Sequence, residues 1–198
     1  MTLAMTHPSS RWPPLLLTLL AGLLLLGHAL WGWIPILDSA NLAFHEAGHP
    51  LFGVLSARLS VYGGTLMQLL LPAACAWECY RREQRYGVYV CLLWIAENGL
   101  NIARYVADAR AHQLPLVGGL DPEDVHDWTE ILSRWGLLNH DTTLAVLIRV
   151  GAVALMAWTV KQAWTRPEGE GRPLAPPSPS PPSCTWAGPP GSATGPTG

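Results

Sequence analysis

The segment from Trp12 to Leu37 constrains the fold of this chain more than any other, because it contains no Asp, Glu, Lys or Arg. A helix of this length is long enough to cross about 30 Å of hydrocarbon. A secretory signal peptide is the alternative, since Arg11 precedes the segment and Gly27-His28-Ala29 resembles a cleavage site. The apolar run continues well beyond that site, which a cleaved signal does not require. The pattern therefore favours an uncleaved first transmembrane helix.

The composition extends this conclusion to the whole chain. Of its 198 residues, 49% are hydrophobic and only 13% are charged, against about 25% charged residues in soluble domains. The net charge is -2 and no basic stripe alternates with aromatic residues, which argues against a nucleic-acid partner. We expect an integral, multi-pass membrane protein whose partner is the lipid bilayer. A bacterial inner or plasma membrane is the expected location, because the sequence contains no recognisable signal for another compartment.

The order of apolar and polar segments predicts an all-α fold, a polytopic membrane helix bundle. We expect about four spanning helices, a partial or re-entrant helix, and a short amphipathic helix in a polar connection. Asp38 or Ser39 is the expected N-cap of the partial helix, and Tyr62-Gly63-Gly64 the expected break after it. The expected spanning segments are 12–37, 65–77, 86–108 and 142–164; the partial helix covers 40–59, and the amphipathic helix runs from Asp121 to Trp135.

The composition changes near residue 166. From Arg166 onwards the chain is rich in Pro, Ser and Gly and has too few apolar residues to form a core. We therefore expect a membrane-embedded domain over residues 1–165 and a disordered tail over residues 166–198.

The partial helix carries the motif H-E-x-x-H, formed by His45, Glu46 and His49. Residues four apart share one face of a helix, so the two imidazoles can bind one metal ion, while Glu46 can reach a water on that metal. Zinc would act there as a Lewis acid and the carboxylate as general base, and Gly48 would leave room for a substrate backbone. The alternative is a pair of structural histidines with satisfied hydrogen bonds. Burying these polar groups in an apolar setting without a purpose is costly, which favours the metal site.

A third ligand is expected from a later segment. Glu97, Asn101, Arg104 and Asp108 recur at helical spacing and form one polar stripe. Ionisable groups at membrane depth indicate function by default. A stripe of structural salt bridges, with Arg104 paired to Glu97 or Asp108, is equally compatible with this pattern.

The motif together with Gly63-Gly64 and the stretch from Asn101 to Asp108 resembles the membrane-embedded zinc metallopeptidases of the site-2 protease type, the M50-like group. The segment from Tyr105 to Arg110, followed by His126-Asp127-Trp128, also resembles an uncharacterised bacterial subgroup of that group. The resemblance covers residues 40–110 and implies a Zn²⁺ ion, Glu46 as general base, and cleavage of a peptide or membrane-protein substrate in or near the bilayer. It implies Asp108 as the third ligand, although the prolines and the glycine usual around that Asp are missing here.

Charge placement bears on the third ligand. Two basic clusters should be cytoplasmic, namely Arg81, Arg82 and Arg85 in one and Lys161, Arg166 and Arg172 in the other. If the motif helix does not cross fully, His45 and His49 lie on the same face as Asp108 and His126, and we expect Asp108 ahead of His126. If it crosses, Glu97 or Asn101 becomes the nearer candidate.

Two functional classes remain open at this point. The first is a membrane-embedded zinc metallopeptidase. The second is a non-catalytic membrane protein, either an inactive relative or a metal-binding or transport component. The presence of Glu46 favours the enzyme, because structural metal binding needs no base at that position.

Overall fold

The computed structural model describes residues 11–114 and 126–165, and over these ranges the chain is helical without strands, which confirms the expected all-α class. The tail predicted over 166–198 and the predicted start of the amphipathic helix at Asp121 lie outside the described residues. The elements are α1 (Trp12–Trp31), α2 (Pro35–Gly53), α3 (Ala57–Arg81), α4 (Arg85–Ala107), α6 (Asp127–Arg134), the 3-10 turn η2 (Leu138–His140) and α7 (Asp141–Thr165).

Three helices are long and apolar enough to cross a membrane, namely Trp12–Trp31, Ala57–Arg81 and the segment Leu138–Thr165. The helix α4 is of similar length but is not among them. Its second half carries Glu97, Asn101 and Arg104, which lower its hydropathy. The helix α2, which bears the H-E-x-x-H motif, is also not among the three.

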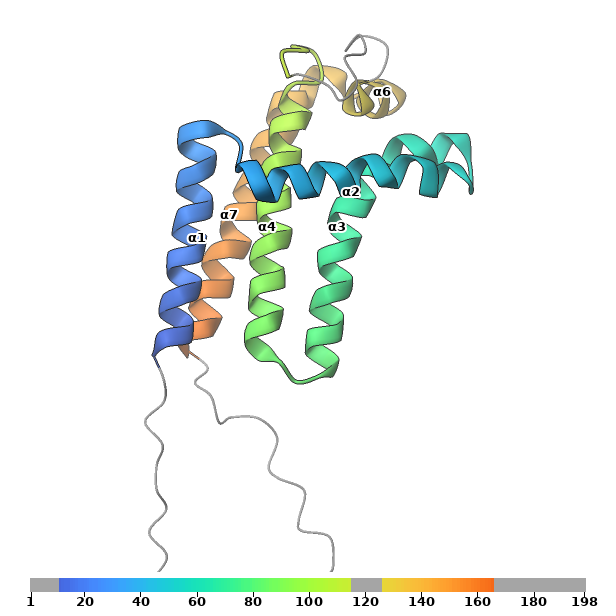
Figure 1. The fold of residues 1–198 in the computed structure, drawn as a ribbon. Helices are drawn as coiled ribbons and strands as arrows, with labels where there is room; N and C mark the ends of the chain where they lie inside the picture. The colour runs from blue at the N-terminus through green and yellow to red at the C-terminus, as the bar shows by residue number, and fades with distance from the viewer. Residues whose placement is uncertain (1–10, 115–125, 166–198) are drawn as a thin grey trace, which may run out of the picture. The chain divides into compact units, whose positions relative to one another are not determined.

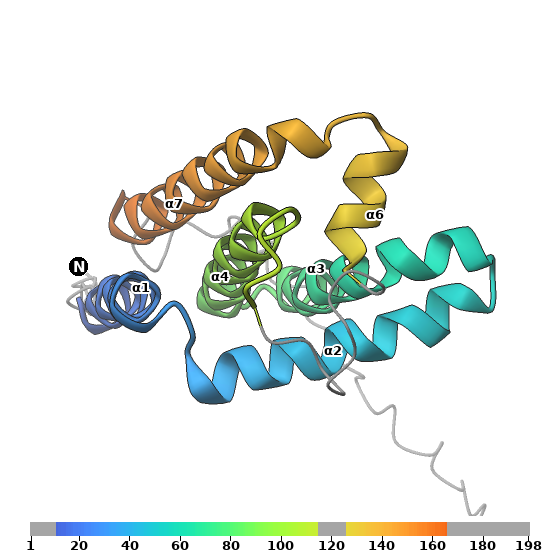
Figure 2. The ribbon, with the colours of Figure 1, turned by 90° about the horizontal axis from the view of Figure 1, so that it is seen from above.

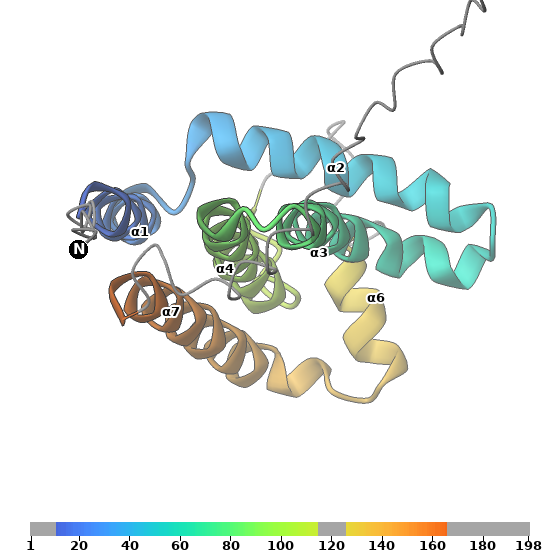
Figure 3. The same cartoon turned by 90° about the horizontal axis from the view of Figure 1, so that it is seen from below.

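The long helices stand side by side, and α2 runs across them (Figure 1). The first turns of α3 run back along α2, and the rest of α3 descends beside α4. Seen from above and from below, α7 lies on the opposite side of α4 from α2 (Figures 2 and 3). The helix α4 thus contacts α3, α7 and α1, and it is the centre of the bundle.

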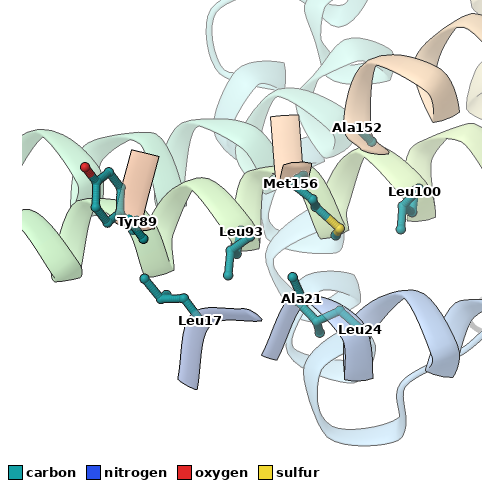
Figure 4. Packing of buried hydrophobic residues seen from close by; sticks show 10 residues of the cluster. Leu17, Ala21, Leu24, Tyr89, Leu93, Leu100, Ala152 and Met156 are labelled. Atoms are coloured by element: carbon teal, nitrogen blue, oxygen red, sulfur yellow. The ribbon is translucent and has the colours of Figure 1, made fainter. Parts of the chain in front are cut away.

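A hydrophobic core joins α1, α4 and α7 (Figure 4). At its centre Leu93 of α4 is fully buried, and Met156 of α7 is 1% exposed. Small residues on the partner helices, such as Ala21 and Ala152, let the backbones approach closely. Large apolar side chains on the outer faces of α1 and α7 remain exposed, as a lipid-facing surface requires; they include Leu16, Leu19, Leu23, Leu147 and Val150.

The first helix ends earlier than predicted. Gly32 adopts a left-handed φ of 64° and donates its N–H to the carbonyl of His28, so it closes α1. Pro35 then begins α2, for which Ile34 is the N-cap. The predicted N-cap at Asp38 or Ser39 was therefore wrong. Asp38 lies in the first turn of α2, where its carboxylate accepts the N–H of Ile34.

The predicted break at Tyr62-Gly63-Gly64 was also wrong, because these residues lie inside the continuous helix α3. The glycines serve a close crossing of α2 and α3 instead. A Cβ on Gly48 would overlap the carbonyl of Gly63, and a Cβ on Gly63 would overlap the carbonyl of Gly48. The sequence pattern indicated a break because glycine marks both turns and close backbone contacts. Gly48 is therefore part of a helix contact.

Candidate metal centre

The two motif histidines lie on the side of α2 that faces α3 and α4. His45 is 5% exposed, and the rings of His45 and His49 are 4.9 Å apart, centroid to centroid. The spacing of four residues therefore places both imidazoles together, as the motif predicts. Gly64 makes this possible, because a Cβ at that position would lie 2.5 Å from the ring of His45.

A carboxylate from a distant segment completes the pair. Oδ2 of Asp127, the first residue of α6, lies 2.9 Å from Nε2 of His45 and 3.3 Å from Nε2 of His49. The three residues offer ligand atoms that all lie within 4.8 Å of one another. Two imidazole nitrogens and a carboxylate oxygen are a donor set that suits zinc and leaves a coordination position for solvent or substrate. These residues could therefore hold a metal ion.

The outer nitrogen of each imidazole is held by an oxygen atom. Nδ1 of His49 lies 2.9 Å from the carbonyl oxygen of Ser60, and Nδ1 of His45 lies 3.1 Å from Oε1 of Gln68. Because a carbonyl oxygen can only accept, each Nδ1 carries the proton and donates it. Both Nε2 atoms then face Asp127, and the outer contacts fix the ring orientations as in established metal sites.

The electrostatics of the site favour a cation among these three side chains. The hydrogen bond to Asp127 raises the pKa of His49 to about 9, although burial opposes the shift. Burial acts to raise the pKa of Asp127, but hydrogen bonds from His45 and His49 outweigh it and hold that pKa below its ordinary value. The carboxylate is therefore ionised at neutral pH, and a divalent cation bound to these atoms would replace the proton on the imidazole.

Glu46 lines a cavity beside the histidines. The cavity has a volume of about 520 Å³ and reaches from His45 and Glu46 to Asp38 and Arg104. Glu46 is exposed, and its carboxylate forms no hydrogen bond or ion pair with the described residues. It is therefore free to contact a water or a substrate in the cavity.

Asp108, the predicted third ligand, is placed elsewhere. Its two carboxylate oxygens accept the N–H groups of Gln113 and Leu114, at 2.8 and 3.0 Å. These bonds hold the turn that follows α4. Asp108 is not in the group formed by His45, His49 and Asp127. The structure therefore brings the two motif histidines together with Asp127 and gives Asp108 a different set of contacts.

His126, the second candidate, is the N-cap of α6. Its Nδ1 accepts the N–H of Thr129, and its ring lies 4.2 Å from the ring of Tyr105. Its Nε2 is buried without a hydrogen bond and lies 3.6 Å from Oδ2 of Asp108. Burial lowers the pKa of His126. The hydroxyl of Tyr105 also accepts the backbone N–H of Asp127, at 3.3 Å, so this cluster positions the start of α6.

Glu97, the third candidate, belongs to a second group with His28 and Asp38, whose ligand atoms also lie within 4.8 Å of one another. Each oxygen of Glu97 already has a donor, with Nε2 of His28 at 3.1 Å and Nδ2 of Asn41 at 2.7 Å. Asp38 accepts from Asn101 at 2.7 Å and from Ile34. The hydrogen bonds satisfy both carboxylates, and the group joins α1, α2 and α4.

Sequence reasoning missed Asp127 as a ligand. The available signal was its place directly after His126 at the start of an amphipathic helix, where the side chains of consecutive residues point in different directions. A list of candidates for the third metal ligand that includes His126 should therefore also include Asp127.

We compared the chain with known protein families, curated proteins and solved structures. No family model, curated protein or solved structure matches this chain.

Proposed function

We propose that this chain is a membrane-embedded zinc metallopeptidase of the kind that its sequence resembles, the site-2 protease type. His45, His49 and Asp127 are the zinc ligands in this proposal, and Glu46 is the general base. The substrate is a membrane protein or peptide that is cleaved in or near the bilayer. Asp127 takes the place that the sequence had suggested for Asp108.

One observation carries the proposal. Nε2 of His45, Nε2 of His49 and Oδ2 of Asp127 converge from α2 and α6, with both Nδ1 atoms already engaged outside the group. A pair of structural histidines would not need two imidazoles to face one carboxylate while a glutamate lies exposed in the adjacent cavity.

The chemistry follows from the positions of these side chains. Zinc, when bound, polarises the substrate carbonyl and lowers the pKa of water. Glu46 takes the proton from the attacking water and passes it to the nitrogen of the leaving amine as the peptide bond breaks. Gln68 and Ser60 hold the imidazoles in the tautomer that leaves both Nε2 atoms as ligands.

The charge distribution supports an orientation in the membrane. The start of α1, the turn between α3 and α4, and the end of α7 lie at the same end of the bundle, opposite α6 (Figure 1). These segments carry Arg11, Arg81, Arg82 and Lys161. We place this basic end in the cytoplasm. The helix α4 then also crosses the membrane, which makes four spans together with α1, α3 and α7. The helix α2 is a partial span near the outer face of a bacterial inner or plasma membrane.

The alternative is a non-catalytic membrane protein. The group of His28, Asp38 and Glu97 favours it, because buried ionisable residues between helices are also typical of transport proteins. The exposed Glu46 beside two convergent histidines has no role in that alternative.

The discriminating experiment compares zinc content and peptide cleavage in the purified protein and its Glu46→Gln variant. The probe is a library of quenched-fluorescence peptides in detergent micelles. Glu46→Gln should retain zinc and lose cleavage by about 10²-fold or more, since it removes the proton acceptor. Glu130→Gln on α6 is the matched control, because Glu130 pairs with Arg134 at the surface. Equal cleavage by wild type and Glu46→Gln would contradict the assignment.

A further inference from the structure

We propose that the cavity next to Glu46 contains a subsite for a carboxylate of the substrate, formed around Arg104. This inference rests on the proposed peptidase function and names the class of peptide the site would take. The peptide carries a carboxylate a few residues from the scissile bond, either on an acidic side chain or at a free C-terminus.

The position of Arg104 in the cavity is the first argument. The same cavity of about 520 Å³ is lined by His45 and Glu46 and also by Arg104, Asn101 and Trp33. Arg104 binds the carbonyl of Gly32, just before α2 begins, whereas His45 and Glu46 lie in the middle of α2. Cavities of this size hold small ligands or short peptide segments. A substrate placed for attack beside Glu46 therefore extends towards Arg104.

The bonding of Arg104 is the second argument. Its Nη1 donates to the carbonyl of Gly32 at 2.7 Å, and among the described residues it has no carboxylate within ion-pair distance. A guanidinium has five N–H donors in a planar fork, which matches a carboxylate. A cation next to apolar helices without an anionic partner is costly. The contact with Gly32 fixes the side chain and leaves most of its donors available to a ligand.

Two carboxylates in the cavity wall must be weighed against this argument. Asp38 is fully buried, and its two carboxylate oxygens already accept hydrogen bonds from Asn101 and Ile34. Glu46 lies in the middle of α2, away from Gly32, to which Arg104 is bonded. Neither forms an ion pair with Arg104, so the guanidinium is the group that attracts an anion at its end of the cavity.

The geometry also gives a spacing. Asp38 accepts a hydrogen bond from Asn101, which lies one helical turn before Arg104 on α4, so Asp38 marks the position of Arg104 along α2. From Asp38 to His45 the axis of α2 rises about 10 Å, at about 1.5 Å per residue. An extended peptide advances about 3.3 Å per residue. A carboxylate bound by Arg104 therefore lies about three residues from the bond that is attacked beside Glu46.

The test is a double-mutant cycle in which one change is made in the peptide substrate and the other in the protein. Quenched-fluorescence peptides carry Glu or Gln at one position at a time, and each is made with a free or an amidated C-terminus. For wild type, one position about three residues from the cleaved bond should show a preference for Glu of about tenfold or more, mainly in KM, because a charge-assisted hydrogen bond is lost with Gln. A preference for the free C-terminus at the same spacing assigns the carboxylate to the chain end.

The protein half of the cycle uses Arg104→Gln, Arg104→Lys and the control Arg149→Gln on the exposed face of α7. Arg104→Gln should abolish the preference for Glu, Arg104→Lys should retain part of it, and Arg149→Gln should leave it unchanged. If Arg104→Gln fails to fold, the comparison of Arg104→Lys with wild type tests the same subsite. A Glu preference that is equal in wild type and Arg104→Gln would overturn the proposal, and so would the absence of any carboxylate preference in wild type.

A binding measurement separates this inference from the proposed function. Fluorescein-labelled Glu and Gln peptides are titrated into the Glu46→Gln protein, with and without Arg104→Gln. If no peptide is cleaved by wild type, the peptidase assignment fails, while a Glu preference in binding that depends on Arg104 still supports the subsite. If peptides are cleaved and binding shows no dependence on Arg104, the subsite alone fails.

Discussion

Nε2 of His45 lies 2.9 Å from Oδ2 of Asp127, although the two residues are 82 positions apart in the chain. This contact joins the helix that carries the H-E-x-x-H motif to the short helix that follows the polar connection. It turns a two-histidine motif into a three-ligand site. The predictions below test the parts of the structure that support this contact.

The hydrogen bond between His45 and Gln68 should tune the affinity for zinc. Gln68→Leu removes the acceptor for Nδ1 of His45 and leaves the imidazole free to rotate. Losses of this kind typically cost about 10–100-fold in metal affinity. Competition with a chromophoric chelator measures the change, and Gln68→Glu, which keeps an acceptor, should lose much less. Equal affinity in Gln68→Leu and wild type would show that this contact has no role in the site.

Gly64 should be required for the position of the His45 ring. A Cβ at Gly64 would lie 2.5 Å from Nε2 of His45, so Gly64→Ala must displace the ring or the helix. We expect zinc affinity to fall by about tenfold or more, as for other misplaced ligands. Gly151→Ala in α7 is the control, because a Cβ there meets no atom within 4 Å. Unchanged zinc affinity in Gly64→Ala would contradict the packing described for α2 and α3.

The proposed orientation can be tested by labelling cysteines in intact cells. In a variant without native cysteines, Glu83→Cys marks the basic turn between α3 and α4, and Ser133→Cys marks α6; both positions are exposed. A membrane-impermeant maleimide added outside should label Ser133→Cys and spare Glu83→Cys until the membrane is opened. The opposite pattern would place the metal centre at the cytoplasmic face.

The tail from Pro167 to Gly198 should be dispensable for the metal centre. Its composition gives it little to bury. A truncated protein that ends at Arg166 should bind zinc with the affinity of the full chain and melt at the same temperature. A large fall in the melting temperature would mean that the tail contributes to the fold.

The local features of this fold were accessible from the sequence, and the long-range ones only in part. Apolar length located the long helices, and the spacing of His45 and His49 placed both on one face. The errors in the predicted helix boundaries came from glycine. Gly32 closes α1, whereas Gly63 and Gly64 permit close helix contacts inside α3. Sequence patterns do not separate these two uses of glycine.

The third ligand shows why the site itself was harder to predict. Asp108 and Asp127 are both buried carboxylates near the same end of the helices. Their roles are decided by tertiary contacts, because Asp108 accepts two backbone N–H groups of its own turn while Asp127 reaches the histidines from α6. No periodicity encodes that difference. The resemblance to metallopeptidases favoured Asp108, which comes first in the chain.

The most direct test of the proposed metal centre is the zinc content of four purified single variants. Wild type should carry about one zinc per chain, and His45→Ala, His49→Ala and Asp127→Ala should each lose it, since removal of one of three protein ligands costs orders of magnitude in affinity. Asp108→Ala should retain zinc with at most a modest loss of affinity, because its carboxylate holds the turn after α4. Stoichiometric zinc in Asp127→Ala, together with its loss in Asp108→Ala, would contradict the assignment of Asp127.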